Sequence, residues 1–412
     1  SEMCIIDRFH LTDPRGASDK SGRTFNNPYQ YFFEQMHMDD AIYADESIYE
    51  YPMQQGGGND GRPYSFGRPS SGGSKAAYPC KSYGQGRINP AYFYGVFDPN
   101  DMRRDVSITM TGSNGKGVEK LIPFVPNSKA EGGGLTLNKW DENRQANPWV
   151  AAQRKSGING PYMRMSEVYL GYAEVCAALG DVVTGKQYLK TVRERSFPQG
   201  LANTDAFIAS FGNDLVRAII EERGFEYAGE GDRRWTLIRS GYLPEDIKRI
   251  KDMTKAMMDG LATKGYYEFE NGNIISAYIW TKLVDAKTIY GHRLTAQCPT
   301  DKVNDPVLYP GWRGQKDNWE EMGLNYGSST PATNLAIKGL FEIVSEEEAA
   351  SLESQGYTKV NWGIDLVDNR DEYDKYLFWD YDYVSAPIYL WPFTPNVMAA
   401  GGFTNGYGFK QE

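Results

Sequence analysis

Aromatic rings and long polar side chains alternate in two aromatic-rich loop regions, residues 54–95 and residues 289–329. Loops of this length inside a folded domain are usually functional or disordered. An aromatic ring can lie against the C–H face of a sugar, while arginine and lysine bind its hydroxyl groups. The pattern predicts an oligosaccharide contact, with a plain surface loop as the alternative. The predicted contact residues are Tyr64, Tyr78, Lys81, Tyr83, Arg87, Tyr309, Trp312, Arg313 and Trp319.

No arrangement of residues indicates catalysis. A glycosidase needs two carboxylates at a fixed separation, and Asp380 and Asp382 are the most enzyme-like pair, although structural or solvated acids are the simpler interpretation. The three histidines, His10, His37 and His292, lie in no recognisable nucleophile context. The four cysteines match no zinc spacing. We therefore predict a protein that is not an enzyme and that binds no cofactor and no metal.

The composition excludes some partners. The 412 residues include 44 basic and 54 acidic side chains, a net charge of −10, and no basic stripe occurs, which argues against nucleic acid. Aromatic residues make up 14% of the chain, and tyrosine is the most frequent of them. Tyrosine can stay partly exposed, with an apolar face toward a ligand and a polar edge toward water. The sequence contains no run of 18 apolar residues, so no membrane-spanning helix is predicted.

Residues 161–242 carry the helical pattern around which the rest of the chain is organised. Gly180 ends a first helix and Asp181 can cap a second. The predicted apolar face of the first helix consists of Met165, Val168, Tyr169, Tyr172, Cys176 and Leu179. A third helix is predicted from about Thr204 through Ile220, and a shorter fourth helix carries Trp235. Four short helices form two helical hairpins, which bury their apolar faces by stacking as repeats.

Shorter signals flank this region. Alternating side chains on both sides of the turn at residues 113–117 predict a β-hairpin over residues 106–125, and Asn271-Gly272 predicts another over residues 266–280. Further helices are predicted at residues 246–261, 332–343 and 346–353, and extended chain at residues 47–53 and 357–367.

Five passages resemble a known family. They are R-x-S-E-V-Y-L-x-Y-A-E-V at residues 164–175, V-R-E-R at 192–195, E-E-R-G-F-E-Y-x-x-E-G-D-R-R-W at 221–235, YGVFDPNDMRRD at 94–105 and YLWPFTPNVMAAGGFTNGY at 389–407. In this order they resemble the SusD/RagB family of outer-membrane nutrient-binding lipoproteins of Bacteroidota. The resemblance covers roughly residues 29–409, with a divergent stretch at about 244–372.

The resemblance implies a mainly α fold of tetratricopeptide-like helical hairpins with long loops and small β-hairpins. It implies one SusD-like domain over residues 1–412, N-terminally incomplete. It further implies capture of an oligomeric nutrient, most simply an oligosaccharide, and its delivery by a hinged lid to a SusC-like TonB-dependent transporter. The alternatives are an oligopeptide-binding RagB-type lipoprotein, a secreted glycoside hydrolase and an assembly adaptor.

The resemblance also implies a place on the extracellular face of the outer membrane. The lipid anchor would sit on an N-terminal cysteine absent from this chain, because the Ser-Glu-Met before Cys4 does not suit lipid processing. The binding residues of the family form no linear motif, so none is carried over by position.

Overall fold

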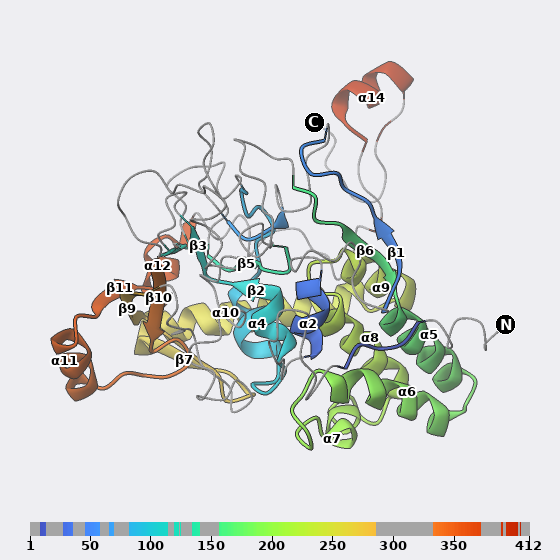
Figure 1. Ribbon diagram of the computed structural model, residues 1–412, viewed down its shortest axis with the longest axis horizontal. Coiled ribbons are helices and arrows are strands. Elements are labelled where there is room, and N and C mark those ends of the chain that lie inside the picture. Colours follow the sequence, from blue (N-terminus) through green and yellow to red (C-terminus); the bar gives the residue numbers. More distant parts are fainter. Residues whose placement is uncertain are drawn as a thin grey trace, which may run out of the picture.

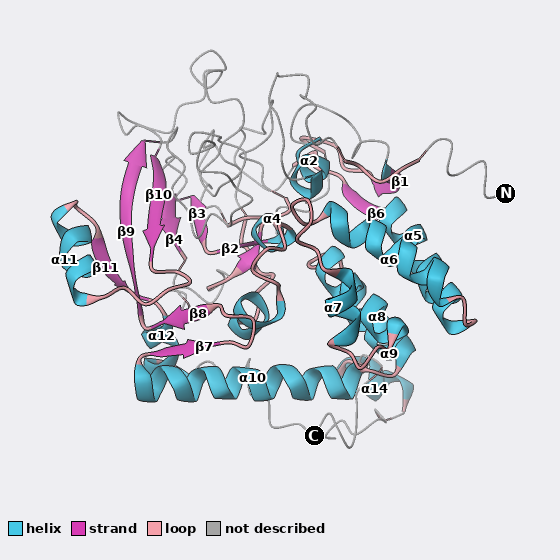
Figure 2. Ribbon diagram, turned by 90° about the horizontal axis from the view of Figure 1, so that it is seen from below, coloured by secondary structure: helices cyan, strands magenta, loops and turns pink. Residues whose placement is uncertain are grey.

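The structure is a computed structural model. Its long helix α10 (Leu243–Lys264) extends from a group of short helices at one end to a group of small sheets at the other (Figures 1 and 2). The structure describes residues 9–13, 28–35, 46–57, 66–69, 82–113, 119–122, 124, 134–140, 156–285, 333–371, 389, 393–402 and 404. Within these residues, no helix has the length and apolar character needed to cross a membrane.

The described chain is mainly helical. Its other helices are α2 (Pro28–Gln35), the π-helix η3 (Tyr92–Val96), α4 (Arg103–Ser107), α5 (Met165–Ala178), α6 (Val182–Arg195), α7 (Thr204–Ala209), α8 (Leu215–Glu226), α9 (Asp232–Ser240), α11 (Glu346–Ser354), α12 (Gly363–Asp368) and α14 (Pro395–Gly401). The strands that the structure describes pair only as small antiparallel sheets, β1–β6, β2–β5, β3–β4, β7–β8 and β10–β9–β11. The predicted mainly α fold with small β-hairpins is confirmed.

The strands are short. They are β1 (Ser47–Tyr51), β2 (Ile108–Thr109), β3 (Thr111–Ser113), β4 (Glu119–Leu121), β5 (Thr136–Leu137), β6 (Gly160–Arg164), β7 (Tyr266–Glu268), β8 (Ile274–Ser276), β9 (Tyr278–Asp285), β10 (Thr333–Lys338) and β11 (Thr358–Asn361). Most are too short to be stable alone and depend on packing against helices.

Helices α5 and α6 form a hairpin. Gly180 adopts a positive φ of 87° after α5, and the side chain of Asp181 caps α6 by accepting a hydrogen bond from the backbone N–H of Thr184. Asn203 and Asp214 cap α7 and α8 in the same way. The apolar core between these helices contains Leu170, Ala173, Leu189, Val192, Ile208, Leu215, Ala218, Ile219 and Tyr227.

Two details of the helical prediction are wrong. Tyr172 and Leu179 are 40% and 82% exposed, because α5 turns Leu170 and Ala173 toward its neighbours instead. The predicted third helix is two helices, α7 and α8. Gly212 and Asn213 between them adopt positive φ values of 65°, a conformation that a continuous α-helix cannot contain.

The hairpin β7–β8 is as predicted, with Gly272 at a positive φ of 81° in its turn. Helix α10 extends beyond the predicted residues 246–261 at both ends, since Pro244 suits a first helical turn and Gly265 closes the last. Strands β3 and β4 pair within the predicted hairpin at residues 106–125, whereas Val106 belongs to α4.

The predicted helix at residues 332–343 is wrong, because residues 333–338 form strand β10 beside β9. Leu335, Ala336 and Ile337 are all buried, as in a strand covered on both faces, and the pairing with β9 outweighs a pattern that also fits a helix. The predicted extended chain at residues 357–367 is correct for β11, but α12 begins at Gly363.

A second apolar core joins the small sheets to α8 and α10. The fully buried Trp362, which precedes α12, packs against Phe124 with ring centroids 4.3 Å apart and donates a hydrogen bond from Nε1 to the hydroxyl of Tyr94 at 2.9 Å. This core also contains Phe93, Phe97, Phe225, Met257, Leu261, Phe269, Ile279, Leu335 and Phe341.

Candidate functional site

Two of the nine predicted contact residues lie within the described chain. Tyr83 is half-buried, and Arg87 has an exposed side chain and a backbone bridge to Thr136 of β5. Outside the described residues lie Tyr64, Tyr78, Lys81, Tyr309, Trp312, Arg313 and Trp319, as well as Asp380 and Asp382. The nine-residue contact therefore stays a prediction.

Eight charged residues of the family-like passages meet in a buried ion-pair network. Glu226 of α8 pairs with Arg103, Arg164 and Arg195. Glu46, just before β1, bridges Arg164 and Arg195 from the other side. The network comprises Glu46, Asp101, Glu222, Glu226, Glu230, Arg103, Lys139, Arg164, Arg193 and Arg195, and none of these side chains is more than 7% exposed. Five acidic and five basic side chains balance, as burial of charge requires.

Arg103 shows how the network positions the helices. Its Nε and Nη2 atoms donate to both carboxylate oxygens of Asp101, at 2.6 to 3.2 Å. Its Nη1 pairs with Glu222 at 2.7 Å and Glu226 at 3.1 Å. Fork-shaped contacts of this kind are strongly directional, so Arg103 sets the distance between α4 and α8.

Lys139 lies at the edge of this network. Its ammonium donates to Glu230 at 2.6 Å and lies 5.1 Å from the ring centre of Tyr29. Burial lowers the pKa of Lys139 to about 8, although the carboxylate of Glu230 opposes this effect. The neighbouring guanidinium of Arg164 contributes to the lowering.

The network makes the fold sensitive to acid. Burial alone would raise the pKa of Glu226, but Arg195, Arg164 and Arg103 outweigh burial and hold this pKa well below its ordinary value of 4.5. A carboxyl with a lower pKa in the folded state contributes stability above pH 4.5 and loses it as the pH falls further. We expect the free energy of unfolding, measured in urea, to fall between about pH 5 and about pH 3. A flat profile would contradict this assignment.

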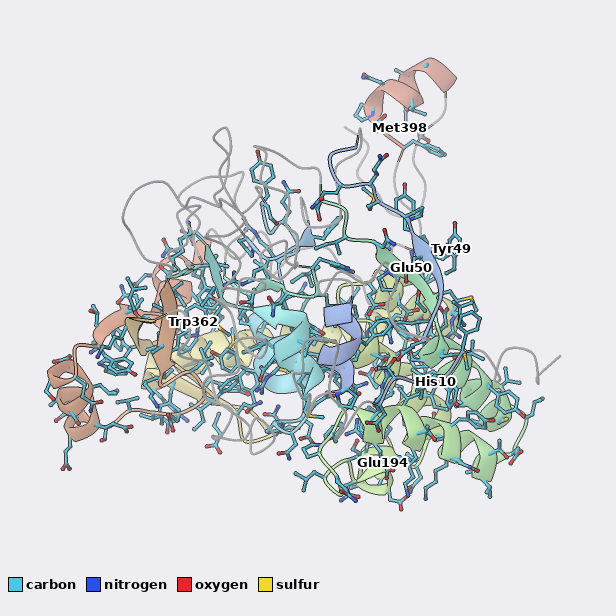
Figure 3. All side chains as sticks on the ribbon, viewed as in Figure 1. His10, Tyr49, Glu50, Glu194, Trp362 and Met398 are labelled. Atoms are coloured by element: carbon cyan, nitrogen blue, oxygen red, sulfur yellow. The ribbon has the colours of Figure 1, made fainter. Side chains whose placement is uncertain are left out.

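The ribbon β1–β6 presents three exposed tyrosine rings, which we call the tyrosine ribbon. Tyr49, Tyr51 and Tyr162 are 58%, 52% and 71% exposed. The rings of Tyr49 and Tyr162 meet edge to face with their centroids 5.7 Å apart. Glu50 between the two β1 tyrosines accepts a hydrogen bond from Asn159 at 2.7 Å (Figure 3). Exposed aromatic rings beside polar groups can bind a flat apolar face such as that of a sugar.

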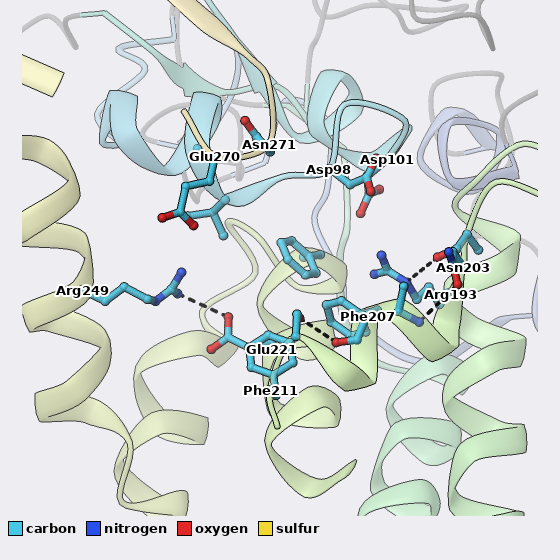
Figure 4. A pocket seen from close by; sticks show the side chains of 16 residues that line it. Asp98, Asp101, Arg193, Asn203, Phe207, Phe211, Glu221, Arg249, Glu270 and Asn271 are labelled. Carbon is cyan, nitrogen blue, oxygen red and sulfur yellow. Dashed lines mark hydrogen bonds and ion pairs between the residues drawn. The ribbon is translucent and has the colours of Figure 1, made fainter. Parts of the chain in front are cut away.

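A cavity of about 460 Å³, the α7–α10 cleft, lies between α7, α8, α10 and the turns at residues 95–101 and 270–271. Figure 4 shows the phenyl rings of its floor below and polar side chains above and at the sides. The side chains that carry its chemistry are Asp98, Glu270, Arg193, Arg249, Phe207 and Phe211. Within the described residues, no group of three or more histidine, cysteine or acidic side chains is arranged to hold a metal.

Comparison with known proteins places the chain in a family. A family model described as the SusD family matches residues 10–392. The chain belongs to the SusD family. Eight of the ten network residues lie in the passages on which the sequence resemblance rested, and they position helices in this SusD-family chain.

Individual relatives are distant. The SusD-like protein P25 of Formosa agariphila is 28% identical over 160 residues, which are 39% of this chain and 26% of that protein. A SusD homologue from Bacteroides thetaiotaomicron is 18% identical with a TM-score of 0.41, over 56% of this chain and 48% of the other. Surface glycan-binding protein A from the same organism, solved with laminarihexaose, is 17% identical with a TM-score of 0.36, over 55% and 48%. The matched part of the chain spans about a quarter of the length of the Formosa protein and about half of the length of the two Bacteroides proteins.

Two surfaces were missed by the sequence reasoning. The weak alternation at residues 47–53 indicated a strand. Tyr49 and Tyr51 are two residues apart on that strand, and this spacing was the signal that could have identified them as rings on one surface. The α7–α10 cleft had no such signal. Its lining residues come from positions as far apart as Asp98 and Glu270, and only the folded chain brings them together.

Proposed function

We propose that this SusD-family protein captures an oligosaccharide at the cell surface. The observation that carries the proposal is the tyrosine ribbon, whose three rings are more than half exposed on a chain of a nutrient-binding family. Rings grouped on one surface and more than half exposed gain little packing energy within the fold, so their exposure favours a role in binding. Tyr83 and Arg87 are the two predicted contact residues that lie within the described chain, and they supply a further ring and a cationic donor.

The energetics suit a carrier. Each ring stacked on a sugar contributes on the order of 1 kcal/mol. Micromolar affinity corresponds to about −8 kcal/mol, so several rings and hydrogen bonds must act together. We include Trp312, Trp319 and the other predicted loop residues in the contact for this reason. Modest affinity also lets the ligand leave, which transport requires.

Delivery follows from capture in this proposal. The protein acts as a hinged lid on a SusC-like TonB-dependent transporter, held at the extracellular face of the outer membrane by a lipid anchor. The protein binds its ligand without cleaving it. Family membership supports both statements.

Replacing Tyr162 with alanine is expected to weaken oligosaccharide binding about fivefold, because the most exposed ring of the ribbon is lost. Isothermal calorimetry against a panel of oligosaccharides and mixed oligopeptides measures the change. Tyr357→Ala, beside β11 at the other end of the molecule, is the matched control and should bind like the wild type (Figure 1).

Each outcome of the panel has a meaning. Saturable binding of one glycan class without cleavage supports capture, and equal binding by Tyr162→Ala removes the ribbon from the site. Binding of peptides alone favours the oligopeptide-binding alternative. Cleavage of a glycan would overturn the proposal in favour of a hydrolase, and the absence of any ligand would favour an assembly adaptor.

A further inference from the structure

We propose that the α7–α10 cleft is a separate binding site for a small zwitterion with an apolar middle, such as a dipeptide with apolar side chains. Asp98 and Glu270 in the cleft form no ion pair with a described cation, two guanidiniums keep a donor without a described acceptor, and an aromatic floor lies between these groups. This site is independent of the tyrosine ribbon and of the proposed oligosaccharide capture.

The acidic groups come from two turns. The Oδ1 atom of Asp98 accepts a hydrogen bond from the backbone N–H of Asn100 at 2.8 Å, which leaves Oδ2 without a hydrogen-bond donor in the described chain. Glu270 is exposed at the tip of the β7–β8 turn. Neither carboxylate forms an ion pair with any described cation. Figure 4 shows both residues above the cavity.

The basic groups come from α6 and α10. Arg193 has a 4% exposed side chain and donates from Nε to the carbonyl of Ala202 and from Nη1 to Glu222. Its Nη2 atom has no acceptor among the described residues. Arg249 uses Nη2 for Asp246 and Glu221, and its Nη1 has no acceptor there either. Both guanidiniums thus retain donors at the sides of the cavity (Figure 4).

The floor between these groups is apolar. The rings of Phe207 and Phe211 meet edge to face with centroids 5.2 Å apart, and the guanidinium of Arg193 lies 3.8 Å from the centre of the Phe207 ring. The cavity of about 460 Å³ falls in the size range of small-molecule sites. Its volume and floor suit one or two apolar side chains.

Charge selects the ligand class. An anion would be repelled by Asp98 and Glu270, and a simple cation would leave the remaining guanidinium donors of Arg193 and Arg249 without an acceptor. A neutral sugar would desolvate these groups without supplying a countercharge. A zwitterion places its ammonium against the unpaired carboxylates and its carboxylate against the guanidiniums, so the carboxylates gain a countercharge and the remaining guanidinium donors gain an acceptor.

The test uses leucyl-phenylalanine with the full chain in isothermal calorimetry. We expect a dissociation constant of roughly 0.1 to 1 mM. N-acetyl-leucyl-phenylalanine and leucyl-phenylalanine amide each lack one charge and should bind at least about threefold more weakly. A neutral disaccharide of similar size should not compete for this site.

Two substitutions remove the negative charges of the cleft and keep the shapes of the side chains. Asp98→Asn and Glu270→Gln should each weaken dipeptide binding about threefold, and together roughly tenfold. Glu268→Gln, exposed on the same hairpin but outside the cavity lining, is the matched control and should bind like the wild type. Thermal unfolding verifies that all the variants are folded.

Three results would overturn the proposal. They are no binding of the dipeptide at millimolar concentration, equal binding of all three peptide forms, and wild-type affinity in the Asp98→Asn/Glu270→Gln variant. If a disaccharide binds to the wild type and does not bind to this double variant, the cleft is a site for a neutral ligand instead. Oligosaccharide capture that depends on Tyr162 is unaffected by each of these results, so the two proposals fail separately.

Discussion

Replacing Glu226 with glutamine is expected to lower the free energy of unfolding by about 3–5 kcal/mol, measured by urea denaturation. Glu226 is fully buried and pairs with Arg103, Arg164 and Arg195. Glutamine has nearly the same shape but no charge, and its NH2 group can only donate. The substitution therefore leaves buried guanidiniums without their central countercharge, which is the costly way to break a buried ion pair.

A second glutamate provides the matched control. Glu194 of α6 is 51% exposed and pairs with Lys190 at 3.5 Å, one helical turn away. Surface pairs of this kind contribute little, so Glu194→Gln should change the free energy of unfolding by less than about 0.5 kcal/mol. If Glu226→Gln stays within about 1 kcal/mol of the wild type, the network does not hold the helices together as described.

Replacing Trp362 with alanine is expected to destabilise the fold by about 3–5 kcal/mol. The indole is fully buried in the second core, packs on Phe124 and donates a hydrogen bond to the hydroxyl of Tyr94. Alanine leaves a cavity lined by the large side chains of this core, which cannot all move to fill it. Urea denaturation followed by circular dichroism measures the loss.

Two further tryptophan variants separate the contributions. Trp362→Phe keeps most of the ring but removes the Nε1 donor, and should cost about 1–3 kcal/mol, since the buried hydroxyl of Tyr94 loses its partner. Trp235→Ala, in which a 55% exposed indole of α9 is removed, should cost less than about 1 kcal/mol. Similar losses for Trp362→Ala and Trp235→Ala would contradict the packing assigned to Trp362.

The helices were predictable where the signals are local. Asp181 caps α6 and Gly180 follows α5, and both signals are visible in neighbouring residues. The strand β10 was not predictable in this way. Its Leu335 and Ile337 fit a helix as well as a strand, and the decision is made by β9, which lies about 50 residues earlier in the chain.

The candidate sites show the same limit more strongly. The family-like passages drew attention to Arg164, Arg195 and Glu226, but not to the contact among them or to Glu46. Spacing in the chain carries no information on a contact between distant residues. The ligand class proposed for the α7–α10 cleft also depends on which charged side chains remain unpaired. The ion pairs of these side chains are known only from the positions of all their neighbours in the folded chain.

The length of chain spanned by the network governs the order in which the parts of the protein can fold. Arg195 lies 149 residues after Glu46, and Glu226 lies 123 residues after Arg103. The α5–α6 hairpin can form early in folding, because its contacts are local. Its docking onto the earlier segments must wait for Glu226, since until then Arg103, Arg164 and Arg195 have too few acidic partners to be buried. Assembly around the network is therefore a late and cooperative step that joins segments far apart in the chain.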